Sequence, residues 1–276
     1  MSFWNKKRVF ITGHTGFKGS WLAFWLHKLK ANLTGYALDP LPHHTLFQKL
    51  ELANCIADLR GDITDLQNLE DAITRSAPEV IIHLAAQPLV RESYRNPVTT
   101  FSTNVLGTVN VLEIARKINS LRCVLVITSD KSYENIEQKH AYTESDRLGG
   151  RDPYSASKGC AELVTRAYTA SYFSTQRQHL VGVATARAGN IIGGGDWAED
   201  RLIPDAMRAF ASDEVLKIRS PTSTRPWQHV LDPLAGYLLL CERMWDDTEK
   251  FSGGWNFGPE NHGIVTVETV ANLLAQ

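Results

Sequence analysis

The sequence predicts an α/β fold built on a doubly wound parallel sheet. Short apolar runs, many of them β-branched, alternate along the first two thirds of the chain with longer amphipathic stretches. A glycine-rich turn, residues 13–19, directly follows the first of these runs. The 276 residues are 43% hydrophobic and 21% charged, a composition that favours a folded globular core over disorder.

Six of the apolar runs are bounded by polar or small residues, a pattern that is typical of buried parallel strands. We expect strands at 9–12, 33–38, 55–59, 80–82, 124–127 and 180–186. We expect the intervening helices at 17–31, 65–77, 98–119 and 154–177. Right-handed crossovers between these elements give a Rossmann-type sheet with helices on both faces.

The pattern becomes irregular after residue 186. The segment 187–276 contains loops rich in Gly, Pro and Arg, with helical stretches near 202–211 and 233–246. We therefore expect two parts, which are a Rossmann domain over 1–186 and a smaller α/β substrate-binding lobe over 187–276.

The charge balance of the chain argues against several classes of partner. There are 29 Lys and Arg residues against 30 Asp and Glu, so 29 − 30 gives a net charge of −1. We therefore expect neither nucleic acid nor a membrane surface as a partner. The longest apolar stretches, such as 234–241, are far shorter than the roughly 20 residues that span a bilayer. Polar and charged residues at 5–8 lead straight into the first strand, without a secretory signal, so we expect a cytoplasmic protein.

The cysteines and histidines show no metal-ligand spacing. The four cysteines are scattered, with no C-x-x-C pair, as Cys55, Cys123, Cys160 and Cys241. The nine histidines include an adjacent pair at 43–44 but no H-x-H or H-E-x-x-H pattern. We expect reduced cysteines and no bound metal.

Gly13, Gly16 and Gly19 stand three residues apart where the first strand turns into the first helix. Glycines in this place let the backbone approach a pyrophosphate, while the N–H groups of the helix point at it. Asp39 lies 20 residues after Gly19, at the end of the second strand. A carboxylate there can accept from an adenosine ribose hydroxyl and would repel a 2′-phosphate. The pattern favours NAD over NADP, and Lys18 leaves NADP open.

The ends of two further strands complete the predicted cofactor site. Asp62 and Ile63 follow the third strand, where a carboxylate can reach the adenine amino group. Small residues after the fourth strand leave room for a cofactor against the backbone. The predicted cofactor-binding residues of the glycine turn and the strand ends are Gly13, Thr15, Gly16, Phe17, Lys18, Gly19, Asp39, Asp62, Ile63, Leu84, Ala85 and Ala86.

Three residues point to proton transfer at a substrate hydroxyl. Ser129 ends the fifth strand, and Tyr154 and Lys158 are four residues apart, on one face of a later helix. A lysine one turn below a tyrosine lowers the pKa of the phenol, so Tyr154 can take a hydroxyl proton near neutrality. Tyr154 and Lys158 are also expected to contact the cofactor. A non-catalytic dinucleotide sensor would have no need for all three residues.

These residues resemble the extended short-chain dehydrogenase/reductase family, which combines this glycine turn with a Ser–Tyr–Lys set. The stretches 12–21, 83–91, 128–133, 152–164, 187–205, 225–237 and 254–259 are similar to the members of that family that dehydrate CDP-glucose. The resemblance implies an NAD-dependent lyase that makes CDP-4-keto-6-deoxyglucose for dideoxyhexose synthesis. NAD takes a hydride from C4, water is eliminated across C5–C6, and the hydride returns to C6.

The resemblance also assigns the elimination to Asp130 and Lys131. Asp130 would be the acid that protonates the departing 6-hydroxyl. Lys131 would be either the base at C5 or a fixed cation that stabilises the enolate, because a lysine accepts a proton only when it is neutral. The dTDP-glucose dehydratases have Glu at the matching position. A nucleotide-sugar epimerase, the alternative within the fold, would have no task for this pair.

The substrate contacts are carried over from the resemblance as well. Asn190, Arg201 and Arg225 are expected at the diphosphate, since guanidinium groups bind phosphate bidentately. Gln228 and His229 are expected to line the pocket for the base or the diphosphate. For Arg187, a structural ion pair is the competing interpretation.

Two further expectations come from the family. The helices at 98–119 and 154–177 match those through which relatives form a homodimer. Relatives also continue past the amphipathic stretch at 266–276, where this chain stops, so we expect the substrate lobe to be truncated at its C-terminal end.

Overall fold

A computed structural model describes residues 2–41, 45–136, 141–173, 180–260 and 263–276. Its main sheet has seven parallel strands in the order β3-β2-β1-β4-β5-β6-β9. The strands are β1 (Arg8–Thr12), β2 (Asn32–Ala37), β3 (Ala57–Arg60), β4 (Val80–His83), β5 (Cys123–Ile127), β6 (Gly182–Ala188) and β9 (Gly253–Phe257). The chain reverses its direction of winding between β1 and β4, as in a doubly wound sheet, so the predicted fold class is confirmed.

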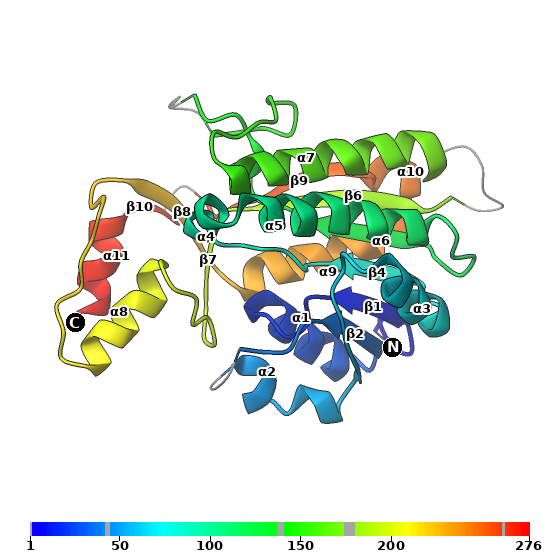
Figure 1. The fold of residues 1–276 in the computed structure, drawn as a ribbon, viewed down its shortest axis with the longest axis horizontal. Helices are drawn as coiled ribbons and strands as arrows, with labels where there is room; N and C mark the ends of the chain where they lie inside the picture. The colour runs from blue at the N-terminus through cyan, green and yellow to red at the C-terminus, as the bar shows by residue number, and fades with distance from the viewer. Residues whose placement is uncertain (1, 42–44, 137–140, 174–179, 261–262) are drawn as a thin grey trace.

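Helices cover both faces of this sheet (Figure 1). They are α1 (Phe17–Lys28), α2 (Leu46–Lys49), α3 (Leu66–Ser76), α4 (Val90–Arg95), α5 (Pro97–Phe101), α6 (Gly107–Ala115), α7 (Pro153–Tyr168), α9 (Leu231–Asp246) and α10 (Thr248–Phe251). Short 3₁₀ turns occupy Leu52–Asn54 and Asp130–Ser132. Each strand points alternate residues to opposite faces, so Val9 and Ile11 pack with α1 and α9. Phe10 packs on the other side with α3 and α6.

The smaller lobe lies at one end of the main sheet, on the left in Figure 1. Its three strands are ordered β10-β8-β7. They are β7 (Asn190–Ile192), β8 (Thr224–His229) and β10 (Ile264–Thr266), and the helices are α8 (Leu202–Ala211) and α11 (Val267–Leu274). The strand β7 directly follows β6, so the lobe stands over the carboxyl edge of the main sheet.

The segment 187–276 does not build the lobe alone. Strand β9 pairs in parallel with β6 and becomes the edge of the main sheet. Helix α9 packs beneath that sheet, where Tyr237 is fully buried. We had expected the helix at 233–246 in the lobe, and this placement is corrected because its buried apolar face needs the core of the main sheet.

Two predicted helices are divided by π-helical turns. The stretch 98–119, predicted as one helix, consists of α5, a π turn at Ser102–Leu106, and α6. Helix α4, which precedes it, was not predicted. Helix α7 ends at Tyr168 and continues as a π turn at Thr169–Phe173. The rest of that predicted helix, 174–177, and the histidine pair at 43–44 lie outside the described residues.

Over the described part of the chain, none of the helices combines the length and the apolar character that crossing a membrane requires.

Candidate active site

A cavity of about 1280 Å³ opens between the carboxyl edge of the main sheet and the lobe. It is lined by the glycine turn, by the ends of β2, β4 and β5, by the start of α7, and by the loops around β7 and α8. In doubly wound folds, ligands bind at this edge, where the strand order reverses. Nearly all of the predicted site residues line this one cavity.

The glycine turn is shaped to admit a dinucleotide. Gly13 has a φ of +76°, and a Cβ there would lie 2.8 Å from the nitrogen of Ala85. A Cβ on Gly19 would lie 2.0 Å from the Gly13 carbonyl oxygen, so neither position accepts a side chain. Gly16, in contrast, would meet only that carbonyl, at 3.4 Å, and it faces the cavity. The turn therefore brings its bare backbone to the cavity wall.

The N-terminus of α1 opens onto the same wall. Gly16 is its N-cap and makes no side-chain capping bond, and Phe17 and Lys18 line the cavity. The first N–H groups of a helix have no partner within the helix and favour an anion such as a pyrophosphate. A dinucleotide therefore fits this turn.

The residues predicted at the adenosine end lie together around the cavity. Asp39, which follows β2, has a side chain that is 88% exposed and faces the opening. Asp62 and Ile63 follow β3, and the Asp62 carboxylate accepts from the backbone N–H of Thr64 at 2.9 Å. Beyond β4, Leu84, Ala85 and Ala86 line the wall as expected, together with Thr15.

Ser129 stands where β5 ends, on a short turn that its own side chain holds. Its hydroxyl accepts from the Lys131 backbone N–H at 3.2 Å and donates to the Asp130 carboxylate at 2.9 Å. Ser129, Asp130 and Lys131 all line the cavity, and the Lys131 side chain is exposed. The chain thus presents a hydroxyl, a carboxylate and an ammonium group at one strand end.

Helix α7 begins at Pro153 because the sequence Asp152-Pro153 favours the start of a helix. The Asp152 carboxylate accepts from the backbone N–H of Ser155 at 2.9 Å, and Pro153 has the φ of a first helical residue. Tyr154 therefore occupies the first turn, with Lys158 one turn further, and both line the cavity. Tyr154 shares a side-chain hydrogen bond with Ser129.

Burial raises the pKa of the Tyr154 phenol to about 12, against the opposing effect of its hydrogen bond with Ser129. We had expected Lys158 to lower this pKa, and that expectation is corrected. The Lys158 ammonium donates to the carbonyl oxygen of Ile127 at 3.3 Å, so its charge is turned toward β5. Burial also lowers the pKa of Lys158 to about 8, and the Glu162 charge partly offsets this.

Lys18 is a second lysine on the cavity wall, and its side chain is half-buried. Burial lowers the pKa of its ammonium to about 7, and the positive charges of Lys158 and Arg201 act in the same direction. The negative charges of Asp130 and Asp196 oppose them. Lys18 therefore changes charge near neutral pH, close to the predicted catalytic groups.

Three of the five predicted substrate residues line the cavity. Asn190 is on β7, Arg201 directly precedes α8, and Arg225 is on β8. Gln228 and His229 do not line it. Gln228 is buried and donates to the Phe257 carbonyl oxygen at 3.0 Å, and the His229 ring accepts from the Leu231 N–H at 3.3 Å. Both predictions are corrected because these side chains join β8 to β9 and to the start of α9.

Other cavity residues were not predicted from the sequence. Asp196 holds Arg201 in an ion pair of 2.8 Å, and Lys217 and Arg219 bring two more cations to the lobe side. The short basic run Lys217-Ile218-Arg219 could have indicated these two residues from the sequence, because cationic side chains bind the phosphate groups of a ligand.

A buried polar network lies behind the Ser129 turn. Glu162, on α7, accepts hydrogen bonds from Thr128 and, at 2.7 Å, from Thr185. It also forms a buried ion pair of 2.7 Å with Arg187. Arg187 therefore belongs to a structural ion pair, which was one of the two interpretations of this residue. Through these contacts Glu162 connects α7 to the end of β5 and to β6.

Replacing Glu162 with Gln is expected to lower the free energy of unfolding by about 3 kcal/mol, because it leaves the buried Arg187 charge unpaired. Urea denaturation measures this loss. The matched control is Glu113→Gln, which removes a surface pair with Arg116 and should cost less than about 1 kcal/mol. Equal stability of the two variants would contradict the structural role of Glu162.

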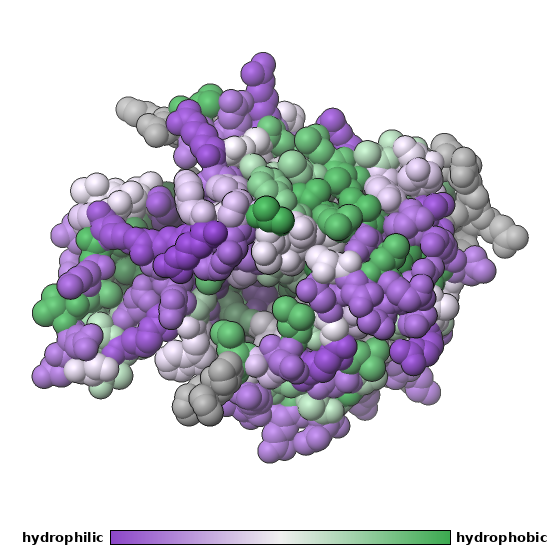
Figure 2. Space-filling view, viewed as in Figure 1, coloured by the Kyte–Doolittle hydropathy of each residue, from purple (hydrophilic) through white to green (hydrophobic). Residues whose placement is uncertain are grey.

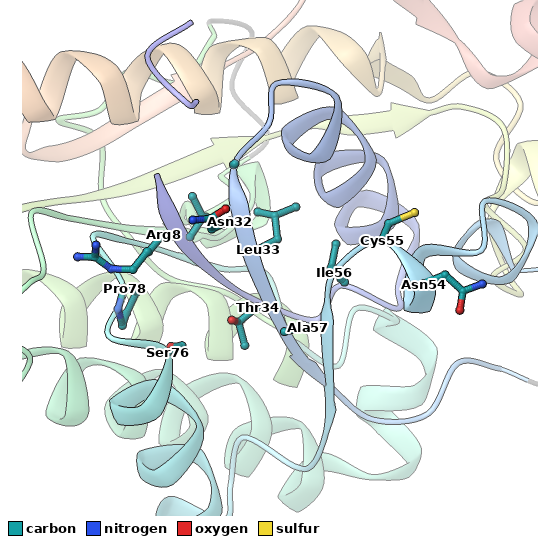
Figure 3. Close-up of a pocket in the computed structure, with 12 residues that line it drawn as sticks. Arg8, Asn32, Leu33, Thr34, Asn54, Cys55, Ile56, Ala57, Ser76 and Pro78 are labelled. Atoms are coloured by element: carbon teal, nitrogen blue, oxygen red, sulfur yellow. The ribbon is translucent and has the colours of Figure 1, made fainter. Parts of the chain in front are cut away.

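A second pocket, of about 560 Å³, lies at the opposite edge of the sheet. Figure 3 shows Arg8, Asn32 and Leu33 on one side of it and Asn54 and Cys55 on the other. It holds none of the predicted site residues, and it lies where β2 extends past the start of β3. The chemistry therefore belongs to the larger cavity.

The comparisons with known proteins agree on one family. Residues 10–252 match the family model described as GDP-mannose 4,6 dehydratase. The chain is 50% identical over 275 residues to the CDP-glucose 4,6-dehydratase of Salmonella typhimurium, covering 99% of this chain and 77% of that protein. It is 29% identical to the dTDP-glucose 4,6-dehydratase of Streptomyces antibioticus, over 84% of this chain and 68% of that protein.

Among solved structures, MoeE5 in complex with UDP-glucose and NAD is similar, with a TM-score of 0.80 and 26% identity. That match covers 97% of this chain and 80% of the MoeE5 chain. The family match spans the glycine turn, the Ser129 turn and the start of α7. The chain therefore belongs to the GDP-mannose 4,6 dehydratase family of nucleotide-sugar enzymes, within the extended short-chain dehydrogenases/reductases.

Proposed function

We propose that this protein is an NAD-dependent hydro-lyase that converts CDP-glucose into CDP-4-keto-6-deoxyglucose, a precursor of dideoxyhexoses. The proposal is carried by the 50% identity to a CDP-glucose 4,6-dehydratase over 99% of the chain. It is supported by one cavity that combines a dinucleotide-shaped turn with Ser129, Tyr154 and Lys158. NAD, when bound, supplies the ability to accept a hydride from C4 of the sugar and to return it to C6.

Tyr154 is the group that exchanges the proton of the 4-hydroxyl, which it would accept as phenolate, the form that the positive charge of a bound, oxidised nicotinamide would favour. Its phenol lies in a buried site, and its hydrogen bond with Ser129 places two hydroxyl groups at one substrate oxygen. Ser129 donates onward to Asp130, which fixes the direction of its hydroxyl. Loss of the 4-hydroxyl proton with oxidation at C4 produces the ketone that acidifies the hydrogen at C5.

Asp130 and Lys131 then carry out the elimination across C5–C6. The Asp130 carboxyl protonates the departing 6-hydroxyl, which leaves as water. Lys131 acts at C5, either by taking the proton there or by stabilising the enolate with its charge. Both residues face the cavity from the turn that follows Ser129. An epimerase needs neither step, so this pair favours the dehydratase.

Cations on the lobe side bind the diphosphate of the substrate. Arg201 and Arg225 line the cavity, and Asn190 adds an amide donor. Asp196 keeps the Arg201 guanidinium in place through their ion pair of 2.8 Å. These groups would bind any nucleoside diphosphate sugar, so the choice of cytosine rests on the similarity to the Salmonella enzyme.

The direct test is to incubate the purified protein with NAD⁺ and CDP-glucose and to follow the alkali-induced absorbance of a 4-keto sugar. CDP-glucose should give product faster than UDP-, GDP- or dTDP-glucose. A protein that binds NAD⁺ but forms no product from any of the four would be a sensor. Release of a C4 epimer without a 4-keto product would indicate an epimerase.

We propose a homodimer formed through α5, α6 and α7, the helices that lie in the predicted stretches 98–119 and 154–177. Figure 2 shows apolar side chains gathered over α5 and α7 on the visible face. Exposed apolar residues in this region are Tyr94, Val98, Phe101, Leu106 and Leu163. Surface patches of this kind are typical of sites that a second chain covers. We place the protein in the cytoplasm, where its four free cysteines would stay reduced.

Leu163→Glu is expected to convert the dimer to a monomer, since it places a charge within the proposed apolar interface. The Leu163 side chain is 47% exposed in the single chain, so folding should be unaffected. Light scattering after size-exclusion chromatography gives the mass. Val215→Glu, at a loop residue that is 86% exposed, is the control and should leave the dimer intact. A monomeric wild-type protein would contradict the proposal.

A further inference from the structure

We propose that a loop of the smaller lobe, residues 193–197, forms part of the cofactor site and covers the glycine turn, and that Trp21 is the positioning residue that holds this lobe loop in place. The inference rests on the proposed function, because it concerns the cofactor of the same cavity. The lobe loop follows β7 and comes down beside α1 (Figure 1). Four of its residues line the cavity, namely Gly193, Gly195, Asp196 and Trp197.

The lobe loop packs directly on the helix that follows the glycine turn. Nε1 of Trp21, on α1, donates to the Gly194 carbonyl oxygen at 2.9 Å. A Cβ on Gly193 would lie 3.3 Å from Cζ of Phe17 and 2.7 Å from Cγ1 of Val230, so the bare backbone lies between these two side chains. Phe17 is the first residue of α1, at the helix end that favours a pyrophosphate. The loop therefore lies against the predicted pyrophosphate site.

The lobe loop also packs on α2. A Cβ on Gly195 would lie 2.7 Å from Cβ of Leu46, which lines the cavity as well, and the φ of Gly195 is +85°. Both facts favour glycine at this position. The ammonium of Lys49 lies over the Trp197 ring, 6.0 Å from the ring centroid. Since α2 comes after Asp39, the loop extends from the pyrophosphate end of the cavity toward the adenosine end.

The far end of the lobe loop is fixed on the substrate side. The Asp196 carboxylate accepts from the Ala198 N–H at 3.2 Å and pairs with Arg201, and its side chain is only 7% exposed. Because Arg201 neutralises the Asp196 charge, the loop can lie beside a pyrophosphate without repelling it. A loop in this place excludes water, which strengthens the attraction between the N–H groups of α1 and the anion. We therefore expect the lobe loop to increase the affinity for NAD⁺.

The test is isothermal titration calorimetry of NAD⁺ and, separately, of CDP with protein stripped of bound nucleotide. Trp21→Phe removes the hydrogen bond to Gly194 but keeps an aromatic ring, and it should bind NAD⁺ about fivefold more weakly than wild type does. Its affinity for CDP should change little, because the substrate end of the loop is held separately. Trp255→Phe is the matched control, since that indole donates to the Phe251 carbonyl oxygen at 2.9 Å, outside the cavity. It should keep the wild-type affinity for NAD⁺.

Gly195→Ala tests the contact with α2 independently. The added Cβ would collide with Leu46 and strain the backbone, so the loop should move and NAD⁺ should bind about tenfold more weakly. Gly253→Ala is the matched control. Gly253 has a φ of +112°, so alanine is strained there too, but its Cβ would have no atom of the described residues within 4 Å. It begins β9, outside the cavity, and its replacement should leave the affinity for NAD⁺ unchanged.

The outcomes separate the inference from the function on which it rests. The inference is wrong if either Trp21→Phe or Gly195→Ala binds NAD⁺ as tightly as wild-type protein does. A loss of affinity for CDP with unchanged affinity for NAD⁺ would assign the lobe loop to the substrate site alone. Wild-type protein that binds NAD⁺ but forms no 4-keto sugar would overturn the proposed function, whereas the expected losses of NAD⁺ affinity would still support the role of the loop.

Discussion

Replacing Tyr154 with Phe is expected to lower kcat for CDP-glucose dehydration by about 10³-fold. The substitution removes only the phenol oxygen, which is the group that exchanges the 4-hydroxyl proton. The ring stays in its buried site, and Ser129 keeps its hydrogen bond to Asp130, so the fold should remain stable. Because the variant keeps every proposed phosphate contact, the affinity for CDP-glucose should change little.

The initial rate of 4-keto sugar formation at saturating CDP-glucose measures this effect, and calorimetry measures substrate affinity. Tyr168→Phe is the matched control, since that phenol donates to Glu113 at 3.4 Å, away from the cavity. It should retain the wild-type rate. A Tyr154→Phe protein with more than about a tenth of the wild-type rate would exclude Tyr154 as the proton-transfer group.

The sequence predicted the first six strands of the sheet because each contains or adjoins a short apolar run. Strands β1, β4, β5 and β6 are buried along nearly their whole length, whereas the edge strand β3 is half-exposed. The sequence did not predict β9, which begins Gly253-Gly254 and has no such run. That strand exists because Trp255 and its neighbours pair with β6, a contact between segments about 70 residues apart. Helix α9 was assigned to the lobe for the same reason, since only tertiary packing shows that it covers the sheet.

The candidate site divides in a similar way. Residues at the carboxyl ends of parallel strands were predictable, because the topology brings such ends to one edge. The ion pair of 3.5 Å between Asp39 and Arg60 depends on the register of β2 on β3, in which Ala37 lies opposite Arg60. The Glu162–Arg187 pair joins a helix to a strand, and the partners are 25 positions apart in the sequence. No local pattern in the sequence encodes either pairing.

The errors at Gln228 and His229 have a physical cause. Adjacent side chains of a strand point to opposite faces, so a motif that continues along β8 cannot bring every residue to the cavity. Arg225 and Trp227, two apart, line the cavity, whereas Gln228 is turned into the protein. His229 ends the strand and accepts from the backbone of α9. Alternation along β8 would have excluded Gln228 once its pairing was known.

Lys131→Ala is expected to lower the rate of dehydration by about 10³-fold while oxidation at C4 persists. The elimination needs a group at C5, whereas the exchange of the 4-hydroxyl proton depends on Tyr154. The variant should therefore still show the near-ultraviolet absorbance of reduced nicotinamide when CDP-glucose is added. Lys131 is exposed at the cavity, so its loss should not affect folding. Lys117→Ala, which removes a surface ion pair with Glu70, is the control and should keep full turnover.

Lys131→Arg separates the two roles that the chemistry allows. Arginine keeps the positive charge but does not release its proton in proteins, so it cannot act as a base. If Lys131 takes the C5 proton, the Arg variant should be as inactive as the Ala variant. If Lys131 stabilises the enolate by charge, the Arg variant should recover much of the rate. Exchange of the C5 hydrogen in heavy water, measured by mass spectrometry, reports the same step independently, and full turnover of Lys131→Ala would remove the residue from the mechanism.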